Sequence, residues 1–531
     1  MSLPDPDNPY SFDDFLAWRD TADFYDSDPF LKQVIRCFAP GEKEAIDKAA
    51  RETSAKVSSR WKALAEEAAV PEKRPYLVQY DGHNHRIDRI VRPMETLELE
   101  REVFGERLFS DRTSPFEKLT KLYLIYQLGE ACISCPLTCT EGLVALLENY
   151  ADTPELARIL AHCKEGFGDD IAIGSQFLSE IQGGSDVPAN RVEAVETDGV
   201  WRLYGDKFFC SATHADYAVV TAKPRGSEKV GLFIVPAWLP GDKAKEKRNG
   251  YTINRIKWKM GTSELTTAEI SYKGAVAYPA GPLDKGVSNV VGIVLTYSRL
   301  TVGISAAAFM ARACREAHAY SRKRSAFGFA IKEFPMVKDQ IDRLTLFSRR
   351  TLAATFKLYR DFLVLGGIQK KTDGQEPLET KMKRFNIREL IMLQKITAAW
   401  DSTDMVRLAM SIFGGHGVME DFSSLPRLFR DSAINELWEG PRNVLLAQIH
   451  RDFQRASHWY PPDEVIKSLL SGADPAVVTP LEKEAKALVA HPSFFGPDTE
   501  TLEVCRRWDK FCHDLTHAYQ NLAMAEVDAV L

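Results

Sequence analysis

The chain has 531 residues, of which 45% are hydrophobic, 27% charged and 10% aromatic, and its formal net charge is −6. These proportions are typical of a globular protein with a large core, and they exclude a disordered chain, a collagen-like repeat and a disulfide-rich mini-protein. At roughly 150 residues per domain, the length predicts about three or four domains. The slightly acidic balance gives no global electrostatic reason to bind nucleic acid or an anionic membrane.

The cysteine content and the first residues bear on the cellular location. Nine cysteines in 531 residues do not make a disulfide framework. The opening segment 1–10 is proline-rich and acidic, unlike a secretory signal peptide, and no uninterrupted apolar run reaches about 18 residues. We therefore expect a cytoplasmic protein without a membrane span.

Residues 1–165 predict an N-terminal helical domain. The segment 42–69 is rich in Ala, Glu, Lys and Arg and lacks proline and glycine, as a long helix requires. Prolines and an Asp-Gly turn interrupt this pattern over 71–93, and a helical pattern resumes over 94–164.

Residues 166–286 predict a β domain. Asp198-Gly199 is a hairpin turn signal between two short runs. The segments 217–221, 231–235 and 268–272 are rich in the β-branched and aromatic residues that strands favour.

Residues 287–455 predict a helical bundle. The segment 301–324 is Ala-rich, a polar loop is expected over 366–377, and a second long helix is expected over 378–413. Residues 456–531 predict a helical C-terminal extension. The order of helical, β and helical blocks is an α+β organisation, which by itself says nothing about activity.

Two glycine clusters and a basic segment are candidate ligand sites. The segment 179–187 (SEIQGGSDV) places two glycines before a hydroxyl, which suits close backbone approach to a phosphate or a flat ring, although an ordinary loop is the simpler interpretation. The segment 413–418 (FGGHGV) is equally compatible with a helix C-cap and turn. The segment 322–328 (RKRSAFG) joins a basic cluster to an aromatic residue, or is a solvated helix end.

Glu439 lies between Trp438 and a Gly-Pro turn. A carboxylate beside bulky apolar groups tends to be desolvated, which tunes it for proton abstraction near neutral pH. The alternative is an acidic residue at a helix N-terminus, where the macrodipole favours it.

No metal site is expected. Cys132, Cys135 and Cys139 have a helical spacing, but three thiols in an apolar segment without a nearby histidine are more often core packing. His83 and His85 flank a turn and are expected at the surface.

Four segments, taken in their order around a β domain, together resemble the acyl-CoA dehydrogenase flavoprotein family over about residues 100–452. They are 179–187, 322–328, 413–418 and the motif around Glu439. Four features are similar to its alkylation-response branch: Tyr80-Asp81 with Arg86-Ile87-Asp88, the segment 135–138 (CPLT), the Trp-Glu-Gly form of the glutamate motif, and the C-terminal extension. The resemblance implies an N-terminal helical domain, a middle β-barrel-like domain, a C-terminal four-helix bundle and the extension.

The resemblance also implies a reaction. Glu439 matches the base that removes the α-proton of an acyl-CoA thioester, while its backbone N–H and an FAD hydroxyl hold the thioester carbonyl. The β-hydrogen then leaves as hydride to flavin N5, which gives a 2-enoyl-CoA. Ser185, Arg299 and Gly440 match substrate-binding positions, and an electron-transfer flavoprotein or a similar acceptor is the implied partner.

The cofactor implied by the resemblance is FAD. The positions that match its binding residues are Ser179, Gly184, Ser185, Phe209, Ser211, Arg324, Phe327, Gly414, Gly415 and Asn443. Arg324, Phe327 and the two glycines at 414 and 415 match residues that a second subunit offers, so the resemblance implies a homodimer or homotetramer.

The sequence departs from the family pattern at three positions. Pro441 replaces the usual Thr or Ser after Glu-Gly, which removes a hydroxyl and an N–H, and Asn443 is the expected substitute for part of that contact. Ser411 stands where Gln often precedes the Gly-Gly pair, and Phe209 where many members have Trp.

The alternative function is an alkylation-response flavoprotein with weak or vestigial dehydrogenase activity and a protective, DNA-associated role. Residues 451–531 hold 8 Lys+Arg against 13 Asp+Glu, a net charge of −5. Because phosphate binding needs clustered positive charge, this tail argues against a role on nucleic acid.

Overall fold

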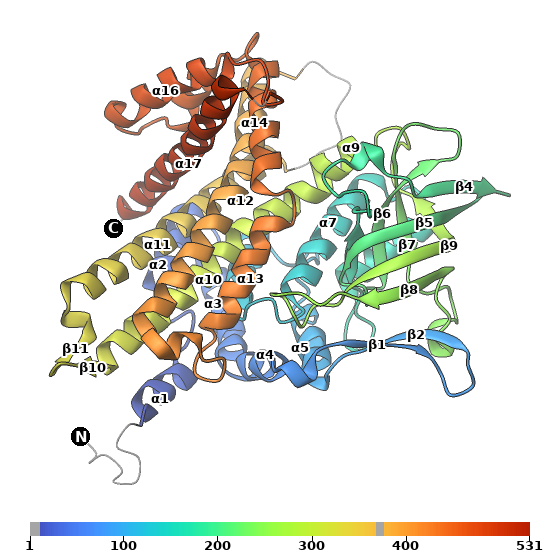
Figure 1. The fold of residues 1–531 in the computed structure, drawn as a ribbon, viewed down its shortest axis with the longest axis horizontal. Coiled ribbons are helices and arrows are strands. Elements are labelled where there is room, and N and C mark those ends of the chain that lie inside the picture. The colour runs from blue at the N-terminus through green and yellow to red at the C-terminus, as the bar shows by residue number, and fades with distance from the viewer. Residues whose placement is uncertain (1–10, 368–375, 497, 531) are drawn as a thin grey trace.

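The computed structural model describes residues 11–367, 376–496 and 498–530. Figure 1 shows a long helical bundle beside a β-sheet body, with the last helices packed against the bundle at its upper end. The expected loop over 366–377 lies mostly outside the described residues.

The N-terminal region is helical, as predicted. The predicted long helix over 42–69 is confirmed, and a π-helical segment, Val57–Trp61, lies within it. The helices of this region are α1 (Asp13–Thr21), α2 (Pro29–Phe38), α3 (Lys43–Lys56), α4 (Lys62–Ala68), α5 (Met94–Phe104), α6 (Pro115–Tyr126), α7 (Ser134–Tyr150) and α8 (Pro154–Glu165).

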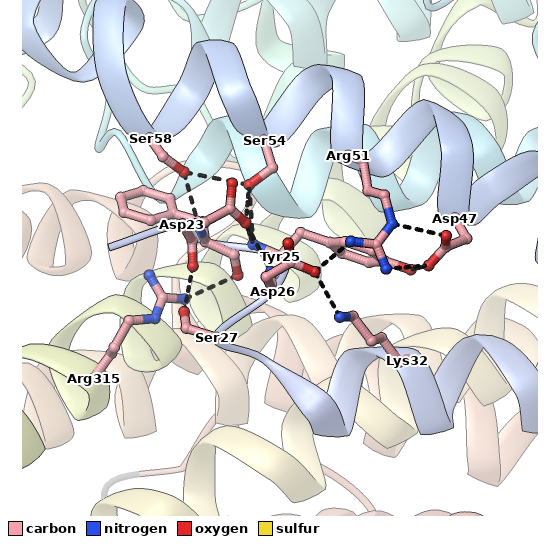
Figure 2. Close-up of polar contacts among 11 residues, drawn as sticks. Asp23, Tyr25, Asp26, Ser27, Lys32, Asp47, Arg51, Ser54, Ser58 and Arg315 are labelled. Atoms are coloured by element: carbon pink, nitrogen blue, oxygen red, sulfur yellow. Dashed lines mark hydrogen bonds and ion pairs between the residues drawn. The ribbon is translucent and has the colours of Figure 1, made fainter. Parts of the chain in front are cut away.

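Polar contacts fix the turn between α1 and α2 against α3 (Figure 2). The Asp23 carboxylate accepts hydrogen bonds from the backbone N–H groups of Tyr25 (2.8 Å) and Asp26 (2.7 Å) and from Ser54 Oγ (2.8 Å). Arg51 of α3 pairs with Asp26 at 2.6 Å. The turn thereby satisfies its backbone donors without regular structure.

A β-hairpin that the sequence did not predict follows α4. Its strands are β1 (Tyr76–Tyr80) and β2 (Arg86–Val91). The long turn between them is held by Asp81, whose carboxylate accepts from the N–H groups of His83 and His85, both at 2.8 Å. Both histidines are exposed, as expected. The sequence showed the Asp81-Gly82 turn but not the strands beside it, because the connection 81–85 is longer than the two-residue loop that an Asp-Gly hairpin signal predicts.

The middle region is a seven-stranded sheet in the order β3-β6-β4-β5-β9-β7, with β8 paired to β9. An additional β6–β7 pairing closes the strands into a barrel, so the barrel-like expectation is confirmed. The strands are β3 (Gly174–Phe177), β4 (Glu193–Thr197), β5 (Val200–Ser211), β6 (Tyr217–Pro224), β7 (Gly231–Pro236), β8 (Tyr251–Ile256) and β9 (Thr267–Pro279). The predicted turn at Asp198-Gly199 joins β4 to β5.

Long helices form the bundle beside the barrel. They are α10 (Leu295–Lys323), α11 (Pro335–Val364), α12 (Leu378–Phe413), α13 (Leu425–Leu437) and α14 (Arg442–Ala456). The predicted helix over 378–413 is confirmed. The helical stretch Gly286–Lys323 is long and apolar enough to cross a membrane, but 78% of its most apolar window is buried, because α10 is packed among the other helices.

The C-terminal extension completes the same core. Its helices are α15 (Pro462–Leu469), α16 (Pro475–Val489) and α17 (Thr499–Asp528). Trp508 of α17 is buried and donates its indole N–H to the Leu446 carbonyl at 2.9 Å. The extension is therefore an integral layer on α11 and α12.

Candidate active site

A sharp turn between α13 and α14 presents Glu439. Glu439 and Gly440 both have positive φ, 59° and 98°, and Pro441 caps the start of α14. Such a backbone is costly for a glutamate and persists only where its surroundings hold it. At Gly440 a side chain would also crowd Leu445, whose Cδ2 would lie 3.0 Å from the added Cβ.

Two buried cations hold this turn. Arg299 Nε of α10 donates to the Glu439 carbonyl at 3.1 Å. Lys395 Nζ of α12 donates to the Glu436 carbonyl at 3.0 Å and to the Gly440 carbonyl at 2.8 Å. Arg299 is 5% exposed and Lys395 0%. The sequence had pointed to Arg299 as a substrate residue, and it had not singled out Lys395.

Glu439 borders a small cavity of about 20 Å³ between α7, α10 and α13. The other residues that line it are Tyr126, Glu130, Ser134, Cys135, Thr138, Cys139, Thr262, Val302, Ser305, Phe309, Asp431, Asn435 and Trp438. The carboxylate thus faces an enclosed space whose walls come from elements far apart in the chain.

The placement of the cysteines near this cavity differs in part from expectation. Cys132 is buried but lies in the loop before α7, with a φ of 58°, so the three thiols do not share one helix. Cys135 and Cys139, whose sulfurs are 3.8 Å apart, line the Glu439 cavity. All three cysteines lie in the hydrophobic core, so their interpretation as core packing is confirmed, and the i, i+4 spacing of Cys135 and Cys139 places these two on a shared face.

The electrostatics of the turn suit a general base. Burial raises the pKa of Glu439 above its ordinary value, while the nearby Arg299 and Lys395 oppose this shift. Burial lowers the pKa of Lys395 to about 7 and that of Arg299 to about 10. Because a base is most effective when its pKa lies near the working pH, the upward shift of Glu439 favours proton abstraction.

A second carboxyl in the cavity was not predicted. Burial and the neighbouring Asp431 raise the pKa of Glu130 to about 8. Both Glu130 oxygens accept from the Cys135 N–H, and Asp431 accepts from the N–H groups of Glu130 and Thr262. The raised pKa favours the uncharged form of Glu130, which lines the cavity beside Glu439.

The first predicted glycine loop is built on a buried ion pair. Lys207 Nζ of β5 contacts the Glu180 carboxylate at 2.8 Å, and the Glu180 oxygens also accept from the N–H groups of Arg191 and Val192. At Gly184 a Cβ would overlap Ser179 Oγ. A side chain at Gly184 would therefore displace the Ser179 hydroxyl, and Ser185 is exposed on the loop.

Strand β5 carries the next two predicted residues beside this loop. The N–H of Phe208 donates to the Ser179 carbonyl at 3.0 Å, which brings the loop next to the half-exposed ring of Phe209. Ser211 Oγ lies 3.1 Å from Thr267 Oγ1, which also accepts from Lys259 Nζ at 2.9 Å. The structure therefore brings the Ser179 loop, Phe209 and Ser211 together on one face of the barrel.

Arg324, Gly414 and Gly415 meet elsewhere, around a cavity of about 540 Å³ that Ser411 also lines. Gly414 has φ 60° and ψ −133°, a conformation open essentially only to glycine. Phe327 is 94% exposed on the turn between β10 (Ser325–Ala326) and β11 (Phe329–Ala330). Figure 1 places this hairpin at the end of the bundle that points away from the barrel. A single chain therefore does not bring the Arg324 cavity next to the barrel face that carries the Ser179 loop and Phe209.

Asn443 is the remaining predicted residue. It is exposed in the first turn of α14, and its Oδ1 accepts only from the neighbouring Val444 N–H within the described chain.

The sequence matches two family models. Residues 175–275 match the acyl-CoA dehydrogenase middle domain, and residues 284–453 match the acyl-CoA dehydrogenase C-terminal domain. Acyl-CoA dehydrogenase family member 11 of Caenorhabditis elegans is 28% identical over 81% of this chain and 70% of its own length. The putative acyl-CoA dehydrogenase AidB of Escherichia coli is 25% identical over 73% of this chain and 70% of its own length.

Solved structures share the fold. The Bd2924 apo-form superposes with a TM-score of 0.83 at 26% identity, over 96% of this chain and 98% of that one. The ACDH-11 complex of Caenorhabditis elegans with C11-CoA has a TM-score of 0.75 at 22% identity, over 94% and 90%. An acyl-CoA dehydrogenase complexed with FAD from Bacillus anthracis has a TM-score of 0.68 at 15% identity, over 93% and 81%.

The two family models together match half of the chain, and they coincide with the barrel and the bundle that present the Glu439 turn. The chain belongs to the acyl-CoA dehydrogenase family.

Proposed function

We propose that this protein is an FAD-dependent acyl-CoA dehydrogenase in which Glu439 removes the α-proton of the thioester. The observation that carries the proposal is the placement of Glu439: its carboxylate borders an enclosed cavity, and its pKa is raised by burial. A half-buried carboxylate in a backbone conformation that costs free energy is the arrangement expected of a base held in place for its task.

The residues of this chain supply the proton chemistry. The Glu439 carboxylate takes the proton from Cα of the acyl group. Its backbone N–H donates to no group of the described residues, so it is available to the thioester carbonyl, which would acidify that proton. Trp438, Phe309 and the two thiols at 135 and 139 wall the cavity and exclude water from the reacting carbons.

The residues of the barrel face fit FAD. The glycine at 184 leaves room where a side chain would fill the loop, and the ring of Phe209 offers a flat apolar wall. When bound, FAD supplies the acceptor for the β-hydride, so that the product is a 2-enoyl-CoA. Electrons then pass to an electron-transfer flavoprotein or a similar acceptor.

The direct test is anaerobic bleaching of the purified yellow protein with a panel of saturated acyl-CoAs from short to long chains. We expect at least one to reduce the flavin and to yield the enoyl-CoA by mass spectrometry. A flavin that no acyl-CoA reduces would contradict the dehydrogenase proposal and favour a scaffold role.

FAD would be shared between two subunits. Because Arg324 and the Gly414-Gly415 turn lie away from the barrel face, they fit the pyrophosphate and adenosine of a cofactor held by a second copy, which supports a homodimer or homotetramer.

Arg324→Ala should weaken FAD binding roughly 10- to 100-fold, since a charge-assisted hydrogen bond contributes about 1.5–3 kcal/mol. The oligomer should lose stability together with FAD, as measured by flavin absorbance and light scattering. Arg322→Ala, at the exposed end of the same helix, is the matched control. Full FAD content in the Arg324 variant would contradict a shared site.

The alternative that the sequence leaves open is an alkylation-response flavoprotein with weak or vestigial dehydrogenase activity and a protective, DNA-associated role. The DNA-associated part of this function can be tested on its own.

Because residues 451–531 carry a net charge of −5, we expect no micromolar binding of duplex DNA at physiological salt. Fluorescence anisotropy with a labelled duplex measures this, and tight binding with a steep salt dependence would show that a local basic patch outweighs the net charge.

A further inference from the structure

Lys395 binds the backbone at both ends of the turn that carries Glu439. Its Nζ donates to the Glu436 carbonyl, in the last turn of α13, and to the Gly440 carbonyl, just after the base. One ammonium group thus ties the two ends of the segment 436–440 together. Carbonyls at a helix C-terminus carry partial negative charge, which a cation satisfies well.

We propose that Lys395 is a positioning residue for proton abstraction, which fixes the backbone of the turn 436–440 and so the position of the Glu439 carboxylate beside the cavity between α7, α10 and α13. The inference rests on the proposed function of Glu439 as the base. Lys395 touches neither cavity nor substrate position among the described residues, and it acts through the turn.

A buried lysine needs a specific reason. Taking an ammonium group out of water is costly unless hydrogen bonds compensate it, and an apolar side chain would fill the core of α12 more cheaply. The hydrogen-bond partners of Lys395 Nζ within the described chain are the two carbonyls of the catalytic turn. Its polarity therefore serves this turn rather than the packing of the bundle.

Arg299 and Lys395 hold the turn 436–440 from two different helices, and we call this pair the clamp. Arg299 of α10 holds the Glu439 carbonyl, and Lys395 of α12 holds the carbonyls on either side of it. Helices α10 and α12 pack directly against each other, so both cations stand on a rigid support. Together they stabilise the positive φ that Glu439 would otherwise leave.

The clamp also sets the charge around the base. Arg299 and Lys395 face the Glu439 carboxylate from α10 and α12, and the thiol of Cys135 faces it from α7. Glu436 is the other acidic group that acts on Lys395. Arg299 in turn is influenced by charged groups of α12 and α14, namely Arg388, Glu389 and Asp452. Below its pKa of about 7 Lys395 is charged, so its removal takes away, on the acidic side of neutral pH, one of the two cations that favour the ionised base.

Three variants test the proposal. Lys395→Met removes the charge and the donors at similar size, and Lys395→Gln removes the charge but keeps an N–H donor. Lys383→Met, on an exposed face of the same helix, is the matched control. Two measurements apply to each: the pH dependence of anaerobic flavin reduction by the best acyl-CoA, and amide hydrogen exchange of the segment 436–441.

We expect Lys395→Met to slow flavin reduction by about 10²-fold, the cost of a misplacement near 1 Å, while affinity for an enoyl-CoA product changes much less. The acidic limb of the pH profile should move to higher pH in both Lys395 variants, because Glu439 loses a stabilising cation. The segment 436–441 should exchange faster in the Met variant than in the Gln variant and the control.

Unchanged exchange of 436–441 in both Lys395 variants would overturn the clamp, whatever the activity. If the segment 436–441 exchanges faster but the acidic limb of the pH profile of flavin reduction does not move, Lys395 has a purely structural role. This result would also overturn the proposal. If acyl-CoA does not reduce even the wild-type flavin, the proposed function fails, and the exchange measurement alone then decides whether the clamp exists.

Discussion

Glu439→Gln should slow acyl-CoA-driven flavin reduction by about 10²–10⁴-fold, the usual cost of losing a general base. The Gln side chain keeps the size and most of the hydrogen bonding of Glu439 but removes the basic oxygen pair. FAD content and oligomeric state should not change, because the loop 179–185 and the Arg324 cavity lie apart from the turn. Stopped-flow anaerobic reduction measures the rate.

Two controls make this result specific. Glu464→Gln, at the exposed start of α15, should leave the rate unchanged. An enoyl-CoA product should still perturb the flavin spectrum of the Glu439 variant, since the backbone N–H at 439 is retained. A variant that reduces its flavin as fast as wild type would show that Glu439 is not the base.

The pH dependence of the wild-type rate follows from the direction of the Glu439 pKa. The base works only when ionised, so the rate should fall as the pH drops through its pKa. Because burial raises this pKa, the limb should lie above the ordinary range of a glutamate. This limb should be absent from the residual rate of the Gln variant.

Lys207→Met should lower the free energy of unfolding by about 3–5 kcal/mol, because it leaves the Glu180 carboxylate buried without its cation. Lys207 is 1% exposed, and its Nζ also donates to the Leu178 carbonyl and to Thr221 Oγ1 at 3.1 and 3.0 Å. Since this network shapes the loop 179–185, FAD should be lost with the stability. Urea unfolding and flavin absorbance measure the two effects.

The double variant Lys207→Met with Glu180→Gln is the matched control. Replacing a buried ion pair as a whole is often close to neutral, so the double variant should recover part of the stability lost by the single one. Equal losses in both would show that the charge left on Glu180 is not the cause.

Local patterns determined much of the fold. The sequence alone predicted the helix over 378–413, the long helix over 42–69 and the hairpin at Asp198-Gly199, because each depends on propensity or turn chemistry within a short window. The hairpin of β1 and β2 was missed although Asp81-Gly82 marked its turn, since the connection 81–85 is longer than a two-residue loop and is held by the Asp81 side chain.

The sequence by itself also determined the family, and it predicted Glu439 as the base, because the motif around Glu439 is continuous in the chain. The roles given to all the site residues, Glu439 included, and the domain boundaries stay predictions. What the tertiary structure decided is everything that depends on burial. Lys395, Cys139 and Glu130 lie at least 44 residues from Glu439 in the chain, and no local pattern sets them apart from ordinary core or helix residues. They meet at one turn because α7, α10, α12 and α13 pack together, and packing fixes both which carbonyls a buried cation can reach and which carboxyls lose their water.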